Sequence, residues 1–191
     1  MRLLVRGGSI AAGFGVTRGY VDILRDHYAP RGIEVINRSK IRETSFEGMG
    51  SFGEDIESFR PEVLILHFGI DDAFSAVHRS EFKENLVHIV RLARDRFDPL
   101  VILLTSHSFE DPHEMEAVGI YYRTIREVAT DLYCDMIPIH TYWASYLLGR
   151  KLSSMDFLQK DARYPNEKGH EIYAEAIIQR LDKTLSPLPE T

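Results

Sequence analysis

The stretch Asp161-Ala-Arg-Tyr-Pro-Asn-Glu-Lys-Gly-His170 is the most informative part of this 191-residue chain. It places an aspartate, an aromatic residue and a Pro-Asn pair ahead of Gly-His, and a segment of helical period follows. Asn166 is a typical N-cap, because its side chain can accept a hydrogen bond from a backbone N–H of the first helical turn. The stretch therefore predicts a polar loop that leads into a C-terminal helix.

Outward from this stretch, short apolar runs alternate with segments of helical period, which is typical of a parallel sheet with crossover helices. The predicted strands are Arg2–Arg6, Ile33–Asn37, Val63–Phe68, Leu100–Thr105 and Met136–Ile139. Apolar residues at spacings of three and four predict helix faces at 82–97, 125–132 and 172–181. We expect one domain over residues 1–185 and a frayed C-terminal tail, 186–191.

Composition excludes several classes of function. The net charge of -6 gives no basic excess for tracking phosphates, so no nucleic-acid partner is expected. Cys134 is the only cysteine, which rules out an intrachain disulfide. The N-terminal residues run from a predicted strand straight into a glycine turn, so neither a signal peptide nor a membrane span is expected. These features predict a cytoplasmic protein, and they leave its oligomeric state open.

Unusual residues follow the first three predicted strands, at the sheet edge where ligands bind in open α/β folds. They are Gly7-Gly8-Ser9, the segment 37–45, and Gly69–Asp72. The glycine turn lacks the lysine of a phosphate-binding loop and the third glycine of a dinucleotide fingerprint. A serine on such a strand-to-helix turn is either a nucleophile or a helix cap.

Taken in order, these segments and Asp161–His170 resemble the sequence blocks of the SGNH/GDSL hydrolases, and the resemblance runs from Leu3 to about Leu181. It implies a three-layer α/β/α sandwich with a parallel five-stranded sheet in flavodoxin-like order. It also implies an esterase or acylhydrolase. Ser9 matches the nucleophile of that family and Asp161 the triad aspartate, but Tyr164 stands where the triad histidine belongs.

Three further positions depart from the family pattern. Gly8 replaces the aspartate that normally precedes the nucleophile. Arg42 replaces a glycine whose backbone N–H, together with that of Ser9, serves the oxyanion hole, and Asp71 replaces an asparagine whose side chain does the same. Because all four departures fall in functional blocks, the site is altered as a unit.

These departures oppose acyl transfer by serine. A tyrosine with an ordinary pKa of about 10 is rarely the phenolate needed to accept a proton at neutral pH. A carboxylate at Asp71 repels the negative charge that an oxyanion donor should stabilise. We expect a protein that is inactive or strongly altered as an esterase. It keeps a cleft for a small acyl or carbohydrate ligand and needs no cofactor.

Three alternatives remain open. The first is an active serine ester hydrolase that uses Ser9, Asp161 and a recruited base, His107 or another histidine, with His170 expected to be a packed residue. A second reading makes His67, Asp71, Asp72 and Asp161 ligands of Mg²⁺ or Ca²⁺, but no known metal-binding spacing supports it, so no metal is predicted.

The third concerns Arg42 and Asp71. Their opposite charges predict a salt bridge that fills the former oxyanion hole. The alternative is that the Arg42 side chain points to solvent.

Overall fold

The computed structural model of the chain describes residues 1–75 and 77–185, so the predicted tail at 186–191 lies outside the described residues. A five-stranded parallel sheet has the order β2-β1-β3-β4-β5. This is the flavodoxin-like order that the family resemblance implies. The strands are β1 (Arg2–Gly7), β2 (Glu34–Asn37), β3 (Val63–His67), β4 (Leu100–Leu104) and β5 (Asp135–Ile137).

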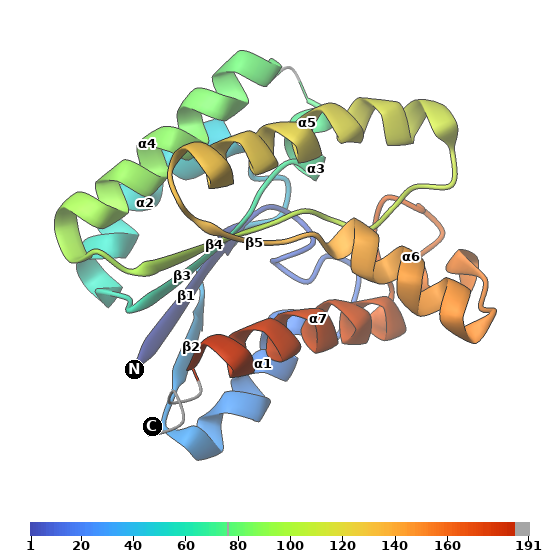
Figure 1. Cartoon of the computed structure of the whole chain (residues 1–191), viewed down its shortest axis with the longest axis horizontal. Coiled ribbons are helices and arrows are strands. Elements are labelled where there is room, and N and C mark those ends of the chain that lie inside the picture. Colours follow the sequence, from blue (N-terminus) through green and yellow to red (C-terminus); the bar gives the residue numbers. More distant parts are fainter. Residues whose placement is uncertain (76, 186–191) are drawn as a thin grey trace.

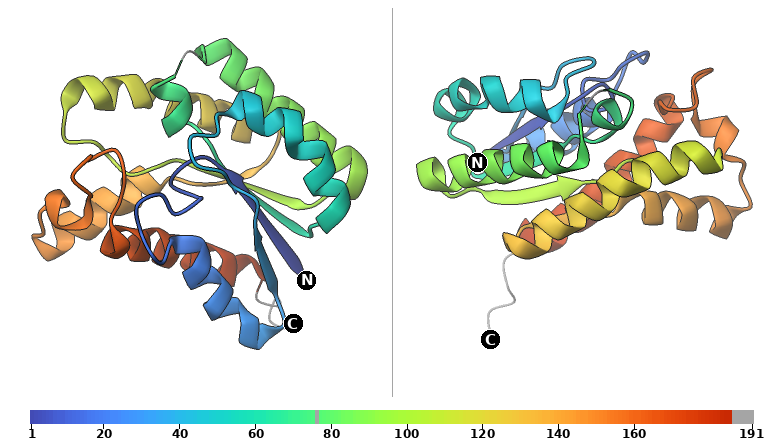
Figure 2. Two further views of the ribbon diagram at one scale, coloured as in Figure 1. Left: turned by 180° about the vertical axis from the view of Figure 1, so that it is seen from behind. Right: turned by 90° about the horizontal axis from the view of Figure 1, so that it is seen from above.

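Helices cover both faces of the sheet and complete the three layers (Figure 1). In the view of Figure 1, α2, α3, α4 and α5 lie above the sheet, and α1, α6 and α7 lie below it. The view from behind in Figure 2 shows the same division. The helices are α1 (Tyr20–Tyr28), α2 (Ser45–Phe59), α3 (Ile70–Ala73), α4 (Arg79–Phe97), α5 (Pro112–Asp131), α6 (Ile139–Arg150) and α7 (Glu167–Leu185), with 3₁₀ turns η1 (Ala29–Arg31) and η2 (Ser154–Phe157).

The apolar runs form strands because helices bury them from both sides, as is usual for parallel sheets. The central strand residues Leu4, Leu64 and Ile102 are fully buried. The predicted helix faces belong to α4, α5 and α7. The start of α7 is also as predicted, since Asn166 Oδ1 accepts a hydrogen bond from the backbone N–H of Gly169 at 3.1 Å.

The predicted strand ends differ from the observed ones by one or two residues. Thr105 and Ile139 were predicted as strand residues, but Thr105 follows β4 and Ile139 begins α6. The strand-to-helix turn at Ser9 predicts a helix in the region of α1, but no bounds or buried faces are predicted for α1, α2 and α6. In α6, apolar side chains are spread around the whole helix, so their spacing marks no single buried face. None of the helices formed by the described residues is long and apolar enough to cross a membrane.

The strand order reverses at β1, which pairs with β2 on one side and with β3 on the other. Loops after these three strands therefore diverge around a crevice at the carboxyl edge of the sheet. The loop before α7 joins them there, because Gln159 donates a side-chain hydrogen bond to the Phe14 carbonyl at 2.7 Å. This arrangement positions the candidate site.

Candidate active site

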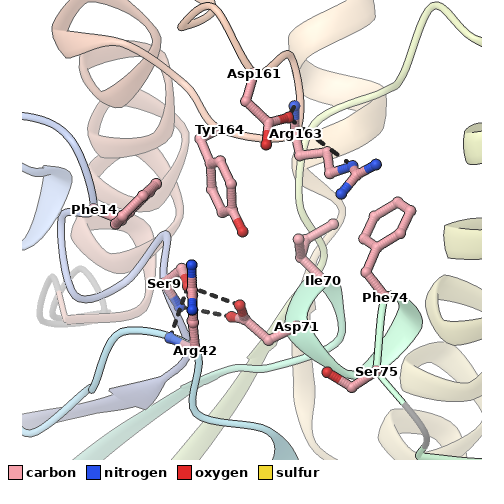
Figure 3. A pocket seen from close by; sticks show the side chains of 10 residues that line it. All are labelled: Ser9, Phe14, Arg42, Ile70, Asp71, Phe74, Ser75, Asp161, Arg163 and Tyr164. Atoms are coloured by element: carbon pink, nitrogen blue, oxygen red, sulfur yellow. Dashed lines mark hydrogen bonds and ion pairs between the residues drawn. The ribbon is translucent and has the colours of Figure 1, made fainter.

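The five residues singled out from the sequence line one cavity of about 290 Å³ at this edge (Figure 3). Ser9 follows β1, Arg42 lies in the loop after β2, and Asp71 is in α3 after β3. Asp161 and Tyr164 come from the loop before α7. The cavity is lined by Ser9, Phe14, Arg42, Ile70, Asp71, Phe74, Ser75, Asp161, Arg163 and Tyr164.

Asp71 accepts both of the hydrogen bonds that Ser9 can donate. The Ser9 hydroxyl donates to Asp71 Oδ1 at 2.7 Å, and the Ser9 backbone N–H donates to Oδ2 at 2.7 Å. Ser9 itself is 0% exposed. In a serine hydrolase the nucleophile's own N–H typically faces the developing oxyanion. Here a carboxylate of the protein takes that N–H.

The Asp71 carboxylate has room because residue 8 is a glycine. A Cβ on Gly8 would lie 2.0 Å from Asp71 Oδ2 and 2.7 Å from the Glu43 carbonyl oxygen. Both distances are far shorter than a van der Waals contact. The departures at residues 8 and 71 therefore depend on each other.

Burial is the largest influence on Asp71 and raises the pKa of its carboxyl above the ordinary value. The two hydrogen bonds from Ser9 act in the opposite direction, as does the more distant charge of Arg42, while Glu47 adds to the rise. Asp71 is thus more basic than an exposed aspartate.

Arg42 keeps the backbone role of the glycine it replaces. Its φ of 62° lies in the left-handed region that glycine favours. Its backbone N–H donates to Ser9 Oγ at 2.8 Å. The local chain conformation of a glycine is therefore preserved, and one potential oxyanion donor still points at the serine.

The predicted salt bridge between Arg42 and Asp71 is wrong. No ion pair joins them in the part of the chain that the structure describes, and the Arg42 side chain is exposed. The physical reason is competition at the carboxylate. Ser9 supplies two short, charge-assisted hydrogen bonds from buried groups, so Asp71 is satisfied without a guanidinium.

Tyr164 lies across the cavity with its hydroxyl pointing toward Ser9 and Asp71 (Figure 3). Its pKa is raised above 10, first by burial and then by the charge of Asp71, while the nearby Ser9 side chain opposes the rise. Its ring packs edge-on against Phe14, with 4.8 Å between centroids. At neutral pH Tyr164 is a neutral phenol that can donate a hydrogen bond, and it lacks the basicity of a histidine.

Asp161 does not hold Tyr164 as a triad aspartate would hold a histidine. Its side chain is 53% exposed, and Oδ1 accepts the backbone N–H of Arg163 at 3.1 Å. The Arg163 guanidinium lies 3.9 Å from the same oxygen and 2.9 Å from Glu114. Asp161 therefore faces an arginine, and within the described chain its carboxylate makes no hydrogen bond to the Tyr164 side chain.

The structure does not bring His107 to Ser9. His107 is 0% exposed, its Nδ1 accepts from the Tyr173 hydroxyl at 2.9 Å, and its Nε2 donates to the Ala162 carbonyl at 3.1 Å. Burial lowers its pKa to about 4. His170 is likewise packed, as expected, and its Nδ1 accepts the Tyr20 backbone N–H at 3.1 Å.

The residues considered as metal ligands serve other partners. His67 bonds the hydroxyls of Tyr20 and Ser106, both at 3.1 Å. Asp72 accepts backbone N–H groups of Ser45 at 2.8 Å and Gly69 at 3.0 Å. Within residues 1–75 and 77–185, no group of three or more histidine, cysteine or acidic side chains is placed to hold a metal ion.

One residue that supports the site was not predicted from the sequence. Arg6 on β1 is 1% exposed and forms ion pairs with Glu43 at 3.1 Å and Asp55 at 3.2 Å. It also donates to the Arg38 carbonyl. Arg6 thus ties β1 to the loop that carries Arg42. The signal was an arginine inside an apolar strand predicted to be buried.

Comparison with solved structures supports this fold assignment. TesA aligns with a TM-score of 0.82 and 21% identity over 97% of this chain and all of its own. LAE5, an α/β hydrolase from the metagenome of Lake Arreo, Spain, has a TM-score of 0.84 and 20% identity over 97% and 96%. A catalytic mutant of Axe2, an acetylxylan esterase of Geobacillus stearothermophilus, has a TM-score of 0.80 and 21% identity over 93% and 92%.

No curated protein sequence matches the chain. The model of the GDSL-like lipase/acylhydrolase family matches residues 5–172, which include the end of β1, the other four strands, Ser9, Asp71 and the loop bearing Asp161 and Tyr164. The chain therefore belongs to the GDSL-like lipase/acylhydrolase family.

Proposed function

We propose that this protein does not hydrolyse esters by a Ser-His-Asp mechanism and that it uses its cavity to bind a small acyl or carbohydrate ligand. The observation that carries the proposal is the double contact of Asp71 with Ser9. The backbone N–H and the hydroxyl of Ser9 both donate hydrogen bonds to the Asp71 carboxylate, at 2.7 Å each.

This contact opposes acyl transfer in two ways. The Ser9 N–H already donates a hydrogen bond to Asp71. A substrate carbonyl would therefore have to displace Asp71 before the oxyanion hole could stabilise the carbonyl oxygen. The carboxylate also places a negative charge where negative charge would develop. Loss of one oxyanion donor alone typically slows such enzymes about 10²–10³-fold. Loss of the triad base can cost about 10⁶-fold in kcat.

The cavity nevertheless has features of a ligand site. Its volume of about 290 Å³ is at the small end of the range for ligand pockets. Phe14, Ile70 and Phe74 supply apolar surface, while Ser75 and Asp71 supply polar groups. The similarity in fold to acetylxylan esterases makes a carbohydrate ligand a reasonable first choice.

A second candidate function rests on the same contact. Asp71 Oδ1 lies within the distance at which a general base takes a proton from a hydroxyl, and burial raises its pKa. A Ser9–Asp71 pair could then hydrolyse activated esters without a histidine. This replaces the recruited histidine of the first alternative, because His107 has partners at both ring nitrogens.

The experiment is hydrolysis of p-nitrophenyl acetate at pH 7.5 by the wild-type chain and by Ser9→Ala. We expect equal rates, because surface nucleophiles would account for all of the wild-type signal. A wild-type rate well above that of Ser9→Ala would refute the proposal and favour the second candidate.

A further inference from the structure

Arg42 has a backbone conformation that an arginine adopts only at a cost. Its φ is 62°, where contact between Cβ and the backbone disfavours every residue with a side chain. Its backbone task, donating N–H to Ser9 Oγ, would be done equally well by a glycine. Arg60, Asp98 and Lys151 also have a positive φ, but each of them ends a helix. Arg42 ends no helix and lines the cavity, where its side chain can act on a ligand.

The Arg42 guanidinium makes no hydrogen bond or ion pair with the described residues, and it is exposed. It lines the cavity and also an adjoining groove of about 570 Å³ formed by residues 40–43, 47, 50 and 51. Arg42 thus lies at the boundary between the cavity and the groove, and the five N–H donors of its guanidinium are free to bind a ligand.

The loop that carries Arg42 is firmly anchored. The next residue, Glu43, is buried and pairs through Oε1 with Arg6 at 3.1 Å and with Lys40 at 3.4 Å. Arg6 donates further bonds to the Gly48 carbonyl at 3.1 Å and the Ser51 hydroxyl at 2.8 Å. An anchored loop lowers the entropy lost when its guanidinium binds a ligand.

The other cation of the cavity is already engaged. Arg163 pairs with Glu114 at 2.9 Å, and its guanidinium lies 4.3 Å from the centre of the Phe74 ring. Of the two arginines that line the cavity, Arg42 is the one without a carboxylate partner among the described residues. A guanidinium in this state suits a carboxylate or phosphate, which it can bind through two parallel hydrogen bonds.

The inner end of the cavity selects a different group. Asp71 offers only acceptors, so it repels an anion and favours a ligand hydroxyl. Tyr164 presents a neutral phenol beside it. We propose that Arg42 binds the carboxylate or phosphate of a small hydroxylated ligand, such as a sugar acid or sugar phosphate, whose hydroxyl end faces Asp71. This inference rests on the proposed function, which makes the cavity a ligand site.

Isothermal titration calorimetry with glucuronate, glucose 6-phosphate and glucose tests the inference. None of these probes contains an ester of a carboxylic acid, so the result does not depend on hydrolysis. We expect the wild-type chain to bind at least one of the two anions at least tenfold more tightly than glucose. The tighter anion identifies whether the ligand carries a carboxylate or a phosphate.

Two variants assign the effect to the Arg42 side chain. Arg42→Gly relieves the left-handed strain and keeps the backbone N–H, so it should fold, and it should lose at least tenfold in affinity for the anion. Arg60→Gly is the matched control. Arg60 also has a positive φ, 41°, and is exposed, but it ends α2 at the opposite edge of the sheet. Its removal changes the net charge equally and should leave binding unchanged.

Two results would overturn the role of Arg42 while leaving the cavity a ligand site. One is glucose binding as tightly as both anions. The other is an unchanged affinity of Arg42→Gly for the anion. If none of the three probes bound the wild-type chain at millimolar concentration, the ligand class inferred here would be wrong. Ser9-dependent ester hydrolysis, measured separately, would instead refute the proposed function.

Discussion

The carboxylate of Asp71 occupies the space that a side chain at residue 8 would fill, since a Cβ on Gly8 would lie 2.0 Å from Asp71 Oδ2. Two departures from the family pattern, 63 positions apart in the sequence, are therefore one structural change. Ser9 lies between them and donates both of its hydrogen bonds to Asp71.

This relationship predicts energetic coupling between residues 8 and 71. Gly8→Ala should lower the free energy of unfolding by about 1–3 kcal/mol, as overpacking usually does. The same change in an Asp71→Ala background should cost at least about 0.5 kcal/mol less, because one of the two clashes is gone and only the Glu43 carbonyl remains. Urea unfolding of the four chains gives the coupling energy. Strict additivity would mean that the Asp71 side chain moves aside freely.

Restoring the histidine alone should not restore hydrolysis. In Tyr164→His the new imidazole would have no aspartate partner, because Asp161 faces Arg163. Asp71 would still accept the hydrogen bond of the Ser9 N–H. We expect less than a tenfold gain in p-nitrophenyl acetate hydrolysis over the wild-type chain. Adding Asp71→Asn should raise the rate of Tyr164→His by about 10²-fold or more, since it restores an oxyanion donor. Equal rates for the single and double variants would show that Asp71 does not obstruct the site.

The buried ion network around Arg6 should be strongly stabilising as a unit. Arg6→Met leaves the buried carboxylates of Glu43 and Asp55 with only the exposed cations of Lys40 and Arg38, and we expect a loss of about 3 kcal/mol in the free energy of unfolding. Arg18→Met breaks an exposed pair with Asp26 and should cost less than about 1 kcal/mol. Chemical denaturation compares the two. Similar losses would mean that the network is not an anchor for the Arg42 loop.

Stability should fall as the pH is lowered from about 6.5 toward 4. Burial lowers the pKa of His67 to about 3 and those of His107 and His170 to about 4. The unfolded chain, with histidine pKa values near 6.5, binds protons in this window that the folded chain does not. Each histidine then contributes up to about 1.4 kcal/mol of lost stability per pH unit.

Asp71 and Asp72 work against this trend, because burial raises the pKa of both carboxyl groups, that of Asp72 to about 6, and the folded chain gains these protons first. Three histidines should outweigh the two aspartates. Urea unfolding at pH 7 and pH 4.5 measures the net effect, and Asp72→Asn should make the pH dependence steeper. A free energy of unfolding that is constant or rises toward pH 4.5 would show that the histidines are protonated in the folded state.

The strands of the sheet could be predicted because the signal for each strand lies in a few neighbouring residues. Each strand is a short apolar run between polar turns, and the family resemblance supplies the order of the strands. The residues that share the cavity also followed from loop position, since parallel strands bring the loops at Ser9, Arg42 and Asp71 to one edge.

The bonding inside the cavity could not be predicted in the same way. Sequence showed opposite charges at Arg42 and Asp71, which favoured a salt bridge. It did not show the directions of the Ser9 hydroxyl and N–H, whose short bonds to Asp71 leave the arginine unpaired. Arg6 was missed for a related reason, because its acidic partners lie 37 and 49 positions away in the chain.

The most direct test is the rate at which a fluorophosphonate labels Ser9, followed by intact-mass spectrometry, in the wild-type chain and in Asp71→Asn. Asp161→Asn is the matched control, since it makes the same change in charge at an exposed residue of the same cavity. With the carboxylate gone, the Ser9 N–H loses its charge-assisted acceptor, and the amide that replaces it can donate to the phosphonyl oxygen. Labelling in Asp71→Asn should therefore be at least tenfold faster than in the wild-type chain and in Asp161→Asn. Slower labelling in Asp71→Asn would contradict the blocked oxyanion hole and make Asp71 the base of an active serine.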